Sequence, residues 1–299
     1  MRPRSIAFVV LAAPFAAGAQ SRSAQRPPII DMHLHAIWWG PGLVEPLTGL
    51  RAPASSAELR RNTLAAMDRY NIVKAVVSGD LIEEYRLAAP AKVIPGMLLF
   101  GPSVGVDSLR ALHRAGRLGA LAEFAPQYSG LAPNDSALEP YFALAEELDI
   151  PVGLHMGLGP PGAAYGGTPK YRMALSNALL LEEVLLRHPK LRLYVMHAGW
   201  PMAEEMLGLL YAHPQVYVDV AVINWALPRK EFHGYLRRLT EAGFAKRVMF
   251  GSDQMVWPEA FGRAIEAIES ADFLTEDQKR DIFYNNAARF LRLSGAATP

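Results

Sequence analysis

The sequence predicts an α/β protein folded as a closed (β/α)8 barrel, in one domain with an extra C-terminal helix. Three observations predict this fold. Short apolar runs rich in β-branched residues alternate with helical patterns, there are eight such runs, and together they occupy about 260 residues. This alternation is typical of a parallel sheet, and eight repeats in this length match a barrel. A doubly wound open sheet is the alternative, because a strand count does not show closure.

The eight predicted strands are bounded by glycine, proline or polar residues, as strands usually are. In chain order they are residues 27–35, 71–79, 92–100, 119–125, 150–157, 191–199, 215–221 and 247–253. The helical patterns between them include residues 55–71, 135–149, 177–189 and 230–243, and a terminal helix over 275–293 is expected outside the barrel. Ser55 with Glu58, and Thr275 with Gln278, have the spacing of N-terminal capping boxes.

The N-terminal segment predicts export. Arg2 and Arg4 precede a short apolar run over residues 6–17, and Ala17-Gly18-Ala19 supplies small residues for cleavage. This pattern is typical of a secretory signal peptide, here residues 1–19, which leaves residues 20–299 as a periplasmic or extracellular domain. A disordered or membrane-anchoring segment is the alternative, although twelve apolar residues are few for a membrane span.

Composition limits the partners and the metal ligands. The chain has 299 residues, is 51% hydrophobic, and balances 30 Lys and Arg against 29 Asp and Glu, so neither nucleic acid nor an anionic membrane surface is an expected partner. We expect a small-molecule substrate and no membrane association of the mature form; a homo-oligomer is compatible with the sequence. Because the chain has no cysteine, a metal ion would have to be held by His, Asp and Glu.

Four of the eight histidines end predicted strands: His33, His35, His155 and His197. Two carboxylates follow the same rule, Glu123 near the end of the fourth strand and Asp253 at the end of the eighth. Barrel enzymes assemble their sites at this rim, from several strands, so this grouping predicts a catalytic metal centre. The other four histidines occupy helical patterns or helix ends, where we expect them to be solvated: His113, His188, His213 and His233.

The first strand carries an H-x-H pair. His33 and His35 are separated by roughly 6.6 Å along a strand, so both imidazoles can converge on one ion. Regular alternation would turn Asp31 and both histidines toward the barrel axis. The apolar residues of this strand would then face the surrounding helices: Ile30, Met32 and Leu34.

Four motifs occur in order on strands one, five, six and eight: "DMHLH", "GLHMG", "VMHAGWP" and "FGSD". As a set they resemble the amidohydrolase superfamily. More narrowly, they resemble the amidohydrolase-related branch that contains aminocarboxymuconate-semialdehyde decarboxylase and γ-resorcylate decarboxylase, over about residues 28 to 293. The resemblance implies that an ion is held by four residues: His33, His35, His155 and Asp253.

The same resemblance gives two residues alternative roles. His197 would be a ligand of a second metal or the acid/base that meets the substrate. Many sites of this superfamily have a carboxylated lysine on the fourth strand to bridge two metals; this chain has Glu123 there, which would bridge two ions or contact the substrate beside one. We expect a divalent metal, foremost Zn, with Mn or Fe possible on these ligands.

Rim loops and aromatic residues provide candidates for substrate binding. The loop over residues 157–172 is long and rich in glycine and proline, and loops of this kind often cover a substrate. Tyr165 and Arg172 in or beside it could hold a polar group. Tryptophans that follow strand ends could form a pocket wall, or simply cover the barrel: Trp38, Trp39, Trp225 and Trp257.

Two further motifs are expected to be turns and loops. "GPSVG" (101–105) matches a serine nucleophile elbow, but that reading needs a late histidine and leaves the strand-end histidines unexplained. "GLGPPG" (157–162) matches a dinucleotide fingerprint, but Pro160 and Pro161 have no N–H for a phosphate, and no helix follows at once.

The sequence thus predicts a metal-dependent hydrolase that acts on an amide, ester or lactone. Asp253 would accept the proton of the attacking water, and His197 could stabilise the oxyanion. A metal-dependent non-oxidative decarboxylase, with an arginine holding the substrate carboxylate, is the first alternative. A metal-binding protein without catalysis is the second.

Overall fold

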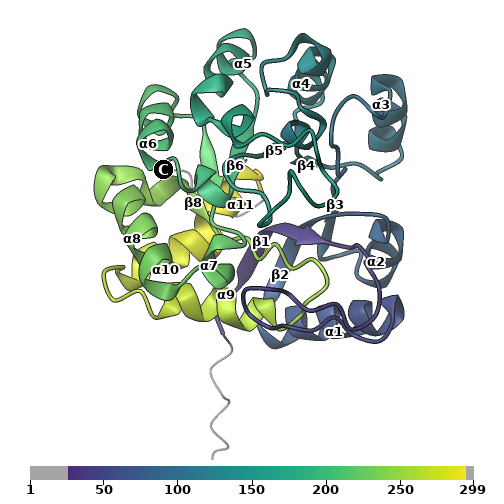
Figure 1. The fold of residues 1–299 in the computed structure, drawn as a ribbon, viewed down its shortest axis with the longest axis vertical. Coiled ribbons are helices and arrows are strands. Elements are labelled where there is room, and N and C mark those ends of the chain that lie inside the picture. Colours follow the sequence, from purple (N-terminus) through teal and green to yellow (C-terminus); the bar gives the residue numbers. More distant parts are fainter. Residues whose placement is uncertain (1–25, 294–299) are drawn as a thin grey trace, which may run out of the picture.

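The computed structural model describes residues 26–293, so the predicted signal peptide lies outside the described residues. Parallel strands form the centre and helices surround them (Figure 1). Each strand falls within a predicted run: β1 (Ile29–His35), β2 (Ile72–Ser78), β3 (Val93–Pro95), β4 (Leu121–Phe124), β5 (Val152–His155), β6 (Leu193–Met196), β7 (Tyr217–Asp219) and β8 (Val248–Met249).

Hydrogen bonds close these strands into a barrel. The strands form two parallel sheets, in the orders β1-β2-β3 and β4-β5-β6-β7-β8. At one seam the backbone N–H of Gly119 donates to Pro95 O (2.7 Å), which joins β3 to the start of β4. At the other seam Met32 N–H donates to Phe250 O (2.9 Å), which joins β1 to the end of β8. The chain therefore has the barrel predicted from its sequence rather than an open sheet.

The helices follow the strands around the barrel. They are α1 (Ser56–Arg69), α2 (Ile82–Ala88), α3 (Val106–Arg114), α4 (Glu139–Glu147), α5 (Glu182–Arg187), α6 (Ala203–Ala212), α7 (Ile223–Ala226), α8 (Arg229–Leu239), α9 (Ala260–Glu269), α10 (Glu276–Arg280) and α11 (Asn286–Phe290). Within residues 26–293, none of them combines the length and apolar character needed to cross a membrane.

One of the two predicted capping boxes is complete. Thr275 Oγ1 accepts from Gln278 N–H, and the Gln278 side chain accepts from Thr275 N–H. Ser55 caps α1 by accepting from Glu58 N–H (3.2 Å), but the Glu58 carboxylate accepts from Ala54 N–H instead of Ser55 N–H. The N-terminus of α1 is therefore capped without the reciprocal bond.

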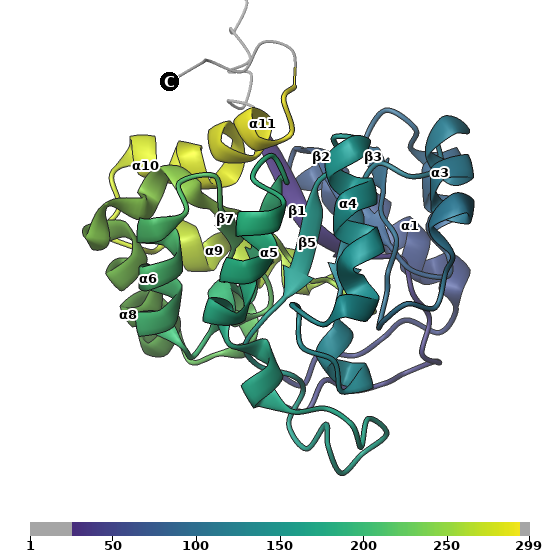
Figure 2. The same ribbon diagram turned by 90° about the horizontal axis from the view of Figure 1, so that it is seen from above.

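The C-terminal segment covers one end of the barrel. Figure 2 shows α11 at this end, with the long loop after β5 extending from the opposite end. Ile30 and Met32 pack in a buried cluster with Tyr194 and Phe290, so the prediction that they face the helix ring was wrong. The physical reason is that β1 pairs irregularly with β2, with register shifts after Ile29 and after Asp31, so the strand does not alternate regularly.

We predict that Gly153→Ala on β5 destabilises the protein by about 1–3 kcal/mol, because it overpacks the barrel interior. A Cβ at Gly153 would lie 2.4 Å from Tyr194 Oη, and Tyr194 is fully buried with its hydroxyl donating to Met32 O (2.9 Å). The midpoint of urea unfolding measures the effect.

The matched control is Gly208→Ala on the exposed face of α6, where a new Cβ meets nothing within 4 Å. We expect this variant to be stabilised by about 0.5–1 kcal/mol through helix propensity. Equal unfolding midpoints for the two variants would contradict the packing described for Gly153.

Candidate metal centre

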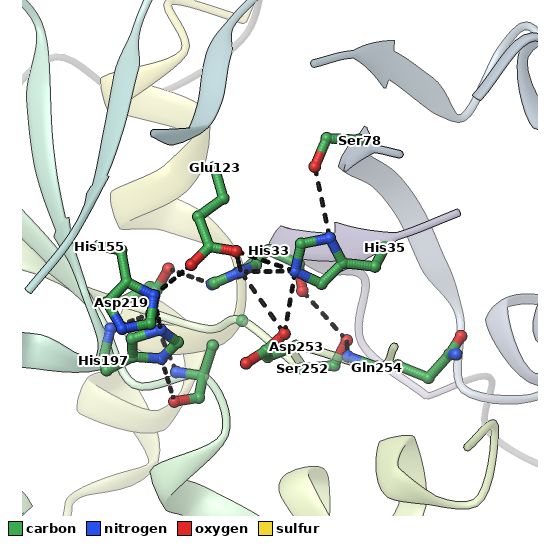
Figure 3. Close-up of polar contacts among 12 residues, drawn as sticks. His33, His35, Ser78, Glu123, His155, His197, Asp219, Ser252, Asp253 and Gln254 are labelled. Carbon is green, nitrogen blue, oxygen red and sulfur yellow. Dashed lines mark hydrogen bonds and ion pairs between the residues drawn. The ribbon is translucent and has the colours of Figure 1, made fainter. Parts of the chain in front are cut away.

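Six predicted ligands converge at the carboxyl ends of the strands (Figure 3). His33 and His35 lie on β1, Glu123 on β4 and His155 on β5. His197 directly follows β6 and Asp253 follows β8. Each of the six residues is at most 8% exposed. The barrel therefore gathers at one end the histidines and carboxylates that the sequence placed at separate strand ends.

The first group of ligand atoms has the spacing of an ion's coordination shell. His33 Nε2 and His35 Nε2 are 3.2 Å apart, and Asp253 Oδ1 lies 3.6 Å from the first and 3.1 Å from the second. Glu123 Oε2 lies 3.6 Å from His33 Nε2 and 3.2 Å from His35 Nε2. Ligands bonded at 2.0–2.1 Å to one tetrahedral or octahedral ion are about 3.0–3.4 Å from each other. The ligand atoms of His33, His35 and Asp253, which all lie within 4.8 Å of one another, therefore fit a shared divalent ion, and Glu123 forms a second such group with His33 and His197.

An unpartnered oxygen supports this fit. Asp253 Oδ1 is buried but accepts no hydrogen bond, although His35 Nε2 is only 3.1 Å away. A buried carboxylate oxygen without a donor is costly. A cation between the carboxylate and the imidazoles would satisfy it.

A second group adjoins the first through the other oxygen of Glu123. Glu123 Oε1 contacts His155 Nδ1, and His197 Nε2 lies 3.2 Å from the same nitrogen. The far nitrogens of both rings face backbone carbonyls, His155 Nε2 at Leu158 O (2.6 Å) and His197 Nδ1 at Ala221 O (3.0 Å). Because a carbonyl only accepts, these bonds fix a proton on each far nitrogen and leave the near nitrogens for a cation.

Asp219, at the end of β7, supports the centre and was missed by the sequence analysis. Its Oδ1 accepts from the backbone N–H groups of His197 (2.9 Å) and Ala221 (3.0 Å), and its Oδ2 lies 3.3 Å from His33 Nδ1. Carboxylates in such positions orient a metal-binding imidazole. A buried aspartate at a strand end, the criterion that identified Asp253, was the signal that could have found it.

Asp31 ties β1 to the segment after β8. Its Oδ1 accepts from the backbone N–H groups of His33 (3.0 Å) and Ser252 (2.9 Å). Burial raises the pKa of Asp31 to about 7. Because His33 is a candidate ligand on β1 and Ser252 directly precedes the candidate ligand Asp253 after β8, this carboxyl fixes the relative placement of the two.

Two site residues have strained backbones. His197 has φ 58° and Asp253 has φ 48°, both in the left-handed region that L-residues seldom adopt. Asp253 is held there by its N–H bond to His33 O (2.7 Å), and His197 by its bond to Asp219. Strain of this kind persists where surrounding contacts impose it, commonly at functional sites.

The carboxylates control the protonation of the imidazoles. Burial alone would lower the pKa of both His33 and His35, but Asp253 and Glu123 outweigh it, so the pKa of His33 lies well above its usual range and that of His35 is about 9. Burial, with His155 and His33 beside it, lowers the pKa of His197 to about 4. Without an ion, protons therefore supply the positive charge that the carboxylates require.

The predicted substrate-binding residues differ in how exposed they are. Trp225 is buried and its Nε1–H donates to Ser252 O (2.6 Å), directly before Asp253. Trp257 is buried and donates to Leu43 O (3.0 Å), whereas Trp38 is half-buried. Tyr165 is 96% exposed. Arg172 is exposed, and its guanidinium donates to the carbonyls of Pro169 and Tyr171 in its own loop.

The remaining histidines are less solvated than expected. His188 is 6% exposed because it lies between the carboxylates of Glu139 (2.7 Å) and Glu146 (3.1 Å), and His213 is 8% exposed. His113 and His233 are half-buried and bond to backbone carbonyls. His188 and His213 each end a helix just before a proline, and each helix end packs against neighbouring residues. The prediction of solvated side chains was therefore wrong for both.

Both rejected motifs lie in turns and loops. Ser103 is exposed in the turn before α3, and its backbone N–H donates to Gly101 O (2.8 Å). Residues 157–162 form loop and turn, and the next helical segment begins only at Met173. These observations agree with the turn and loop expected for the two motifs.

A family model described as amidohydrolase matches residues 30–293. The chain belongs to the amidohydrolase family. Among curated proteins it is similar to "Protein fluG" of Emericella nidulans, at 22% identity over 159 residues. That match covers 48% of this amidohydrolase and 18% of the relative, so the chain spans less than a fifth of the relative's length.

Solved structures share the fold of this amidohydrolase. A probable 2-pyrone-4,6-dicarboxylic acid hydrolase from Acinetobacter baumannii aligns at 16% identity and a TM-score of 0.62, covering 89% of this chain and 99% of that one. A manganese-bound 5-carboxyvanillate decarboxylase from Novosphingobium aromaticivorans aligns at 15% identity and 0.59 (89% and 97%). A 4-oxalomesaconate hydratase from Rhodopseudomonas palustris aligns at 17% identity and 0.61 (88% and 95%).

We predict that His35→Ala lowers the affinity for a divalent ion at least about 100-fold, because losing even an outer partner of a ligand costs 10–100-fold. Metal content after gel filtration, measured by mass spectrometry, tests this. His113→Ala, outside the centre and bonded to Leu118 O, is the matched control and should retain its metal. Equal metal content in both variants would contradict the assignment.

We also predict that metal binding near pH 7.5 releases at least about one proton per ion, since an ion must displace protons from its ligands. The raised pKa values of His33 and His35 mean that these protons are present at this pH in the metal-free protein. The release should diminish as the pH rises above about 9, the pKa of His35. Titration calorimetry in buffers of different ionisation enthalpy measures it, and metal binding without proton release at pH 7.5 would contradict it.

Proposed function

We propose that this protein is a metal-dependent hydrolase that acts on an uncharged ester, lactone or amide. The observation that carries the proposal is that, within residues 26–293, no Arg or Lys side chain is buried. The cations of the rim loops are exposed, and Arg172 is bonded to its own loop. A carboxylate substrate would need a desolvated positive partner beside the metal, whereas a neutral carbonyl compound would not.

The donor set fits a divalent ion, and we propose Zn²⁺, with Mn²⁺ or Fe²⁺ as alternatives. His33, His35 and Asp253 would hold one ion, with Glu123 Oε2 beside it at 3.2 Å from His35 Nε2. Glu123 Oε1, His155 and His197 offer a neighbouring position, so the centre can take one or two. When bound, the ion would supply Lewis acidity, which lowers the pKa of a water and polarises a carbonyl.

Asp253 is the residue we assign to proton transfer. Burial raises its pKa, but His33 and His35 lower it below the usual value overall, so the carboxylate is ionised at neutral pH. It would accept the proton of the attacking water and return it to the leaving oxygen or nitrogen when the carbonyl–heteroatom bond breaks. The proposal therefore has two parts. The residues around Asp253 bind the ion tightly, and Asp253 transfers the proton.

Decarboxylation is the alternative supported by the family, because solved structures with this fold include decarboxylases. The apolar rim supports the hydrolase instead. Exposed apolar side chains occur on the segments after β1, β3 and β5: Trp39, Leu43, Val44, Leu47, Phe100, Tyr165 and Met173. Such a surface favours an apolar, uncharged substrate. That the protein is exported and that its ion is Zn²⁺ both stay predictions.

We expect the metal-loaded protein to release acid from a panel of neutral esters, lactones and amides, and to release no CO₂ from hydroxybenzoates. Asp253→Asn should lower kcat by about 10²–10⁴-fold, the range of general acid–base catalysis. Asp272→Asn, with a side chain 93% exposed, is the matched control and should leave kcat unchanged. CO₂ release with no hydrolysis would contradict the proposal in favour of the decarboxylase, and no turnover of either panel would favour a metal-binding protein without catalysis.

A further inference from the structure

A tyrosine beside the metal centre has an unused hydroxyl. Tyr128 lies in the turn Pro126–Ser129, which directly follows β4, the strand that carries Glu123. Its ring packs edge-on against the imidazole of His155, with centroids 5.3 Å apart and an interplanar angle of 83°. The side chain thus packs against one residue of the proposed centre, His155 on β5, and lies in the turn after the strand that carries another, Glu123.

The hydroxyl of Tyr128 differs from those of four other tyrosines packed in the structure. These four donate to backbone carbonyls at 2.7–3.1 Å: Tyr141, Tyr171, Tyr194 and Tyr235. Across residues 26–293, no hydrogen bond involves Tyr128 Oη, and its side chain is half-buried rather than enclosed. Its proton is therefore available to a molecule that enters the site.

Two carboxylates of the centre affect the pKa of this hydroxyl. Burial raises the pKa of Tyr128, and the charges of Glu123 and Asp253 raise it further. Because Glu123 lies on β4 and Asp253 follows β8, the hydroxyl is within electrostatic reach of both sides of the centre. A tyrosine hydroxyl ordinarily keeps its proton at neutral pH, so it can donate a hydrogen bond to an acceptor oxygen.

The loop after β5 brings its backbone close to the same hydroxyl. A Cβ at Gly159 would lie 3.0 Å from Tyr128 Oη and 2.9 Å from Tyr171 Cζ, so glycine permits this close approach. The rings of Tyr128 and Tyr171 pack with centroids 5.0 Å apart, and Tyr171 Oη donates to Gly157 O (3.1 Å). The loop and Tyr171 therefore restrict the positions that the Tyr128 side chain can adopt.

We propose that Tyr128 is a catalytic residue whose hydroxyl donates a hydrogen bond to the substrate's carbonyl oxygen as negative charge develops on it. The proposal rests on the hydrolase function proposed above. It replaces the role that the sequence analysis gave to His197, whose Nδ1–H is committed to Ala221 O, so that Nε2 has no proton to donate. No covalent bond is made to Tyr128 and no proton is transferred from it. Its hydroxyl stabilises the oxyanion by a hydrogen bond alone.

Tyr128→Phe removes the hydroxyl and keeps the ring. We expect kcat on the best neutral ester or lactone to fall about 100-fold, as for removal of one oxyanion donor, with KM changed less than about threefold. Metal content should equal that of the parent. Tyr141→Phe, which removes a hydroxyl bonded to Val104 O, is the control and should keep parental kcat. Gly159→Ala, which crowds Tyr128 Oη, should also lower kcat without loss of metal.

Binding of acetohydroxamate to the metal-loaded protein gives a readout without turnover. We expect Tyr128→Phe to weaken this binding about tenfold, because a hydroxamate oxygen accepts the same hydrogen bond. A parent that hydrolyses the panel together with a Tyr128→Phe variant of unchanged kcat would overturn the role of Tyr128 and leave the hydrolase intact. A parent without turnover whose hydroxamate binding still depends on Tyr128 would overturn the hydrolase and support the donor. Loss of metal by Tyr128→Phe would show a structural role and overturn the inference.

Discussion

Glu123 and Asp253 are buried carboxylates that face four imidazoles across one end of the barrel. Negative charge in a buried space requires a positive partner close by. In the metal-free protein the raised pKa values of His33 and His35 provide it as protons. A divalent ion meets the same requirement with better geometry, because ring nitrogens and carboxylate oxygens already stand at the separations of ligands on one ion. This cluster of imidazoles and carboxylates must be held in place. The strained backbones of His197 and Asp253 and the hydrogen bonds of Asp219 hold it.

The barrel makes this arrangement possible by closing. Its last strand returns beside its first, and bonds between them bring Asp253 next to His33 and His35 although about 220 residues separate them, a contact that closed parallel barrels create at their strand ends. Asp31 reinforces this seam by accepting from N–H groups on both sides. At the opposite end, α11 covers the barrel interior, so the other end is the one that carries the candidate ligands and the long loop after β5 (Figure 2).

Strands and ligands were predictable because both depend on local pattern. Apolar runs predicted the eight strands, and the rule that barrel sites form at the carboxyl ends of strands grouped the six candidate ligand residues. The sequence could not predict that the side chains of Ile30 and Met32 point into the barrel, because the register shifts of β1 arise from its pairing with β2. The burial of His188 was missed because it depends on two glutamates of another helix.

Tautomers and donors depend on partners far along the chain. His197 was expected to stabilise an oxyanion, but the carbonyl of Ala221, which fixes its proton, comes from the loop after β7. The sequence predicted no role for Tyr128, because a single tyrosine after a strand matches no functional motif. Its role arises from what surrounds it, namely His155, Gly159 and the two carboxylates.

The central claim is that His33, His35 and Asp253 share one cation. Anomalous diffraction at the metal absorption edge, from crystals of the metal-loaded protein, tests it most directly. The account predicts a peak about 2.0–2.3 Å from His33 Nε2, His35 Nε2 and Asp253 Oδ1. A metal-loaded crystal with no peak among these atoms, or with its ion bound elsewhere, would contradict it.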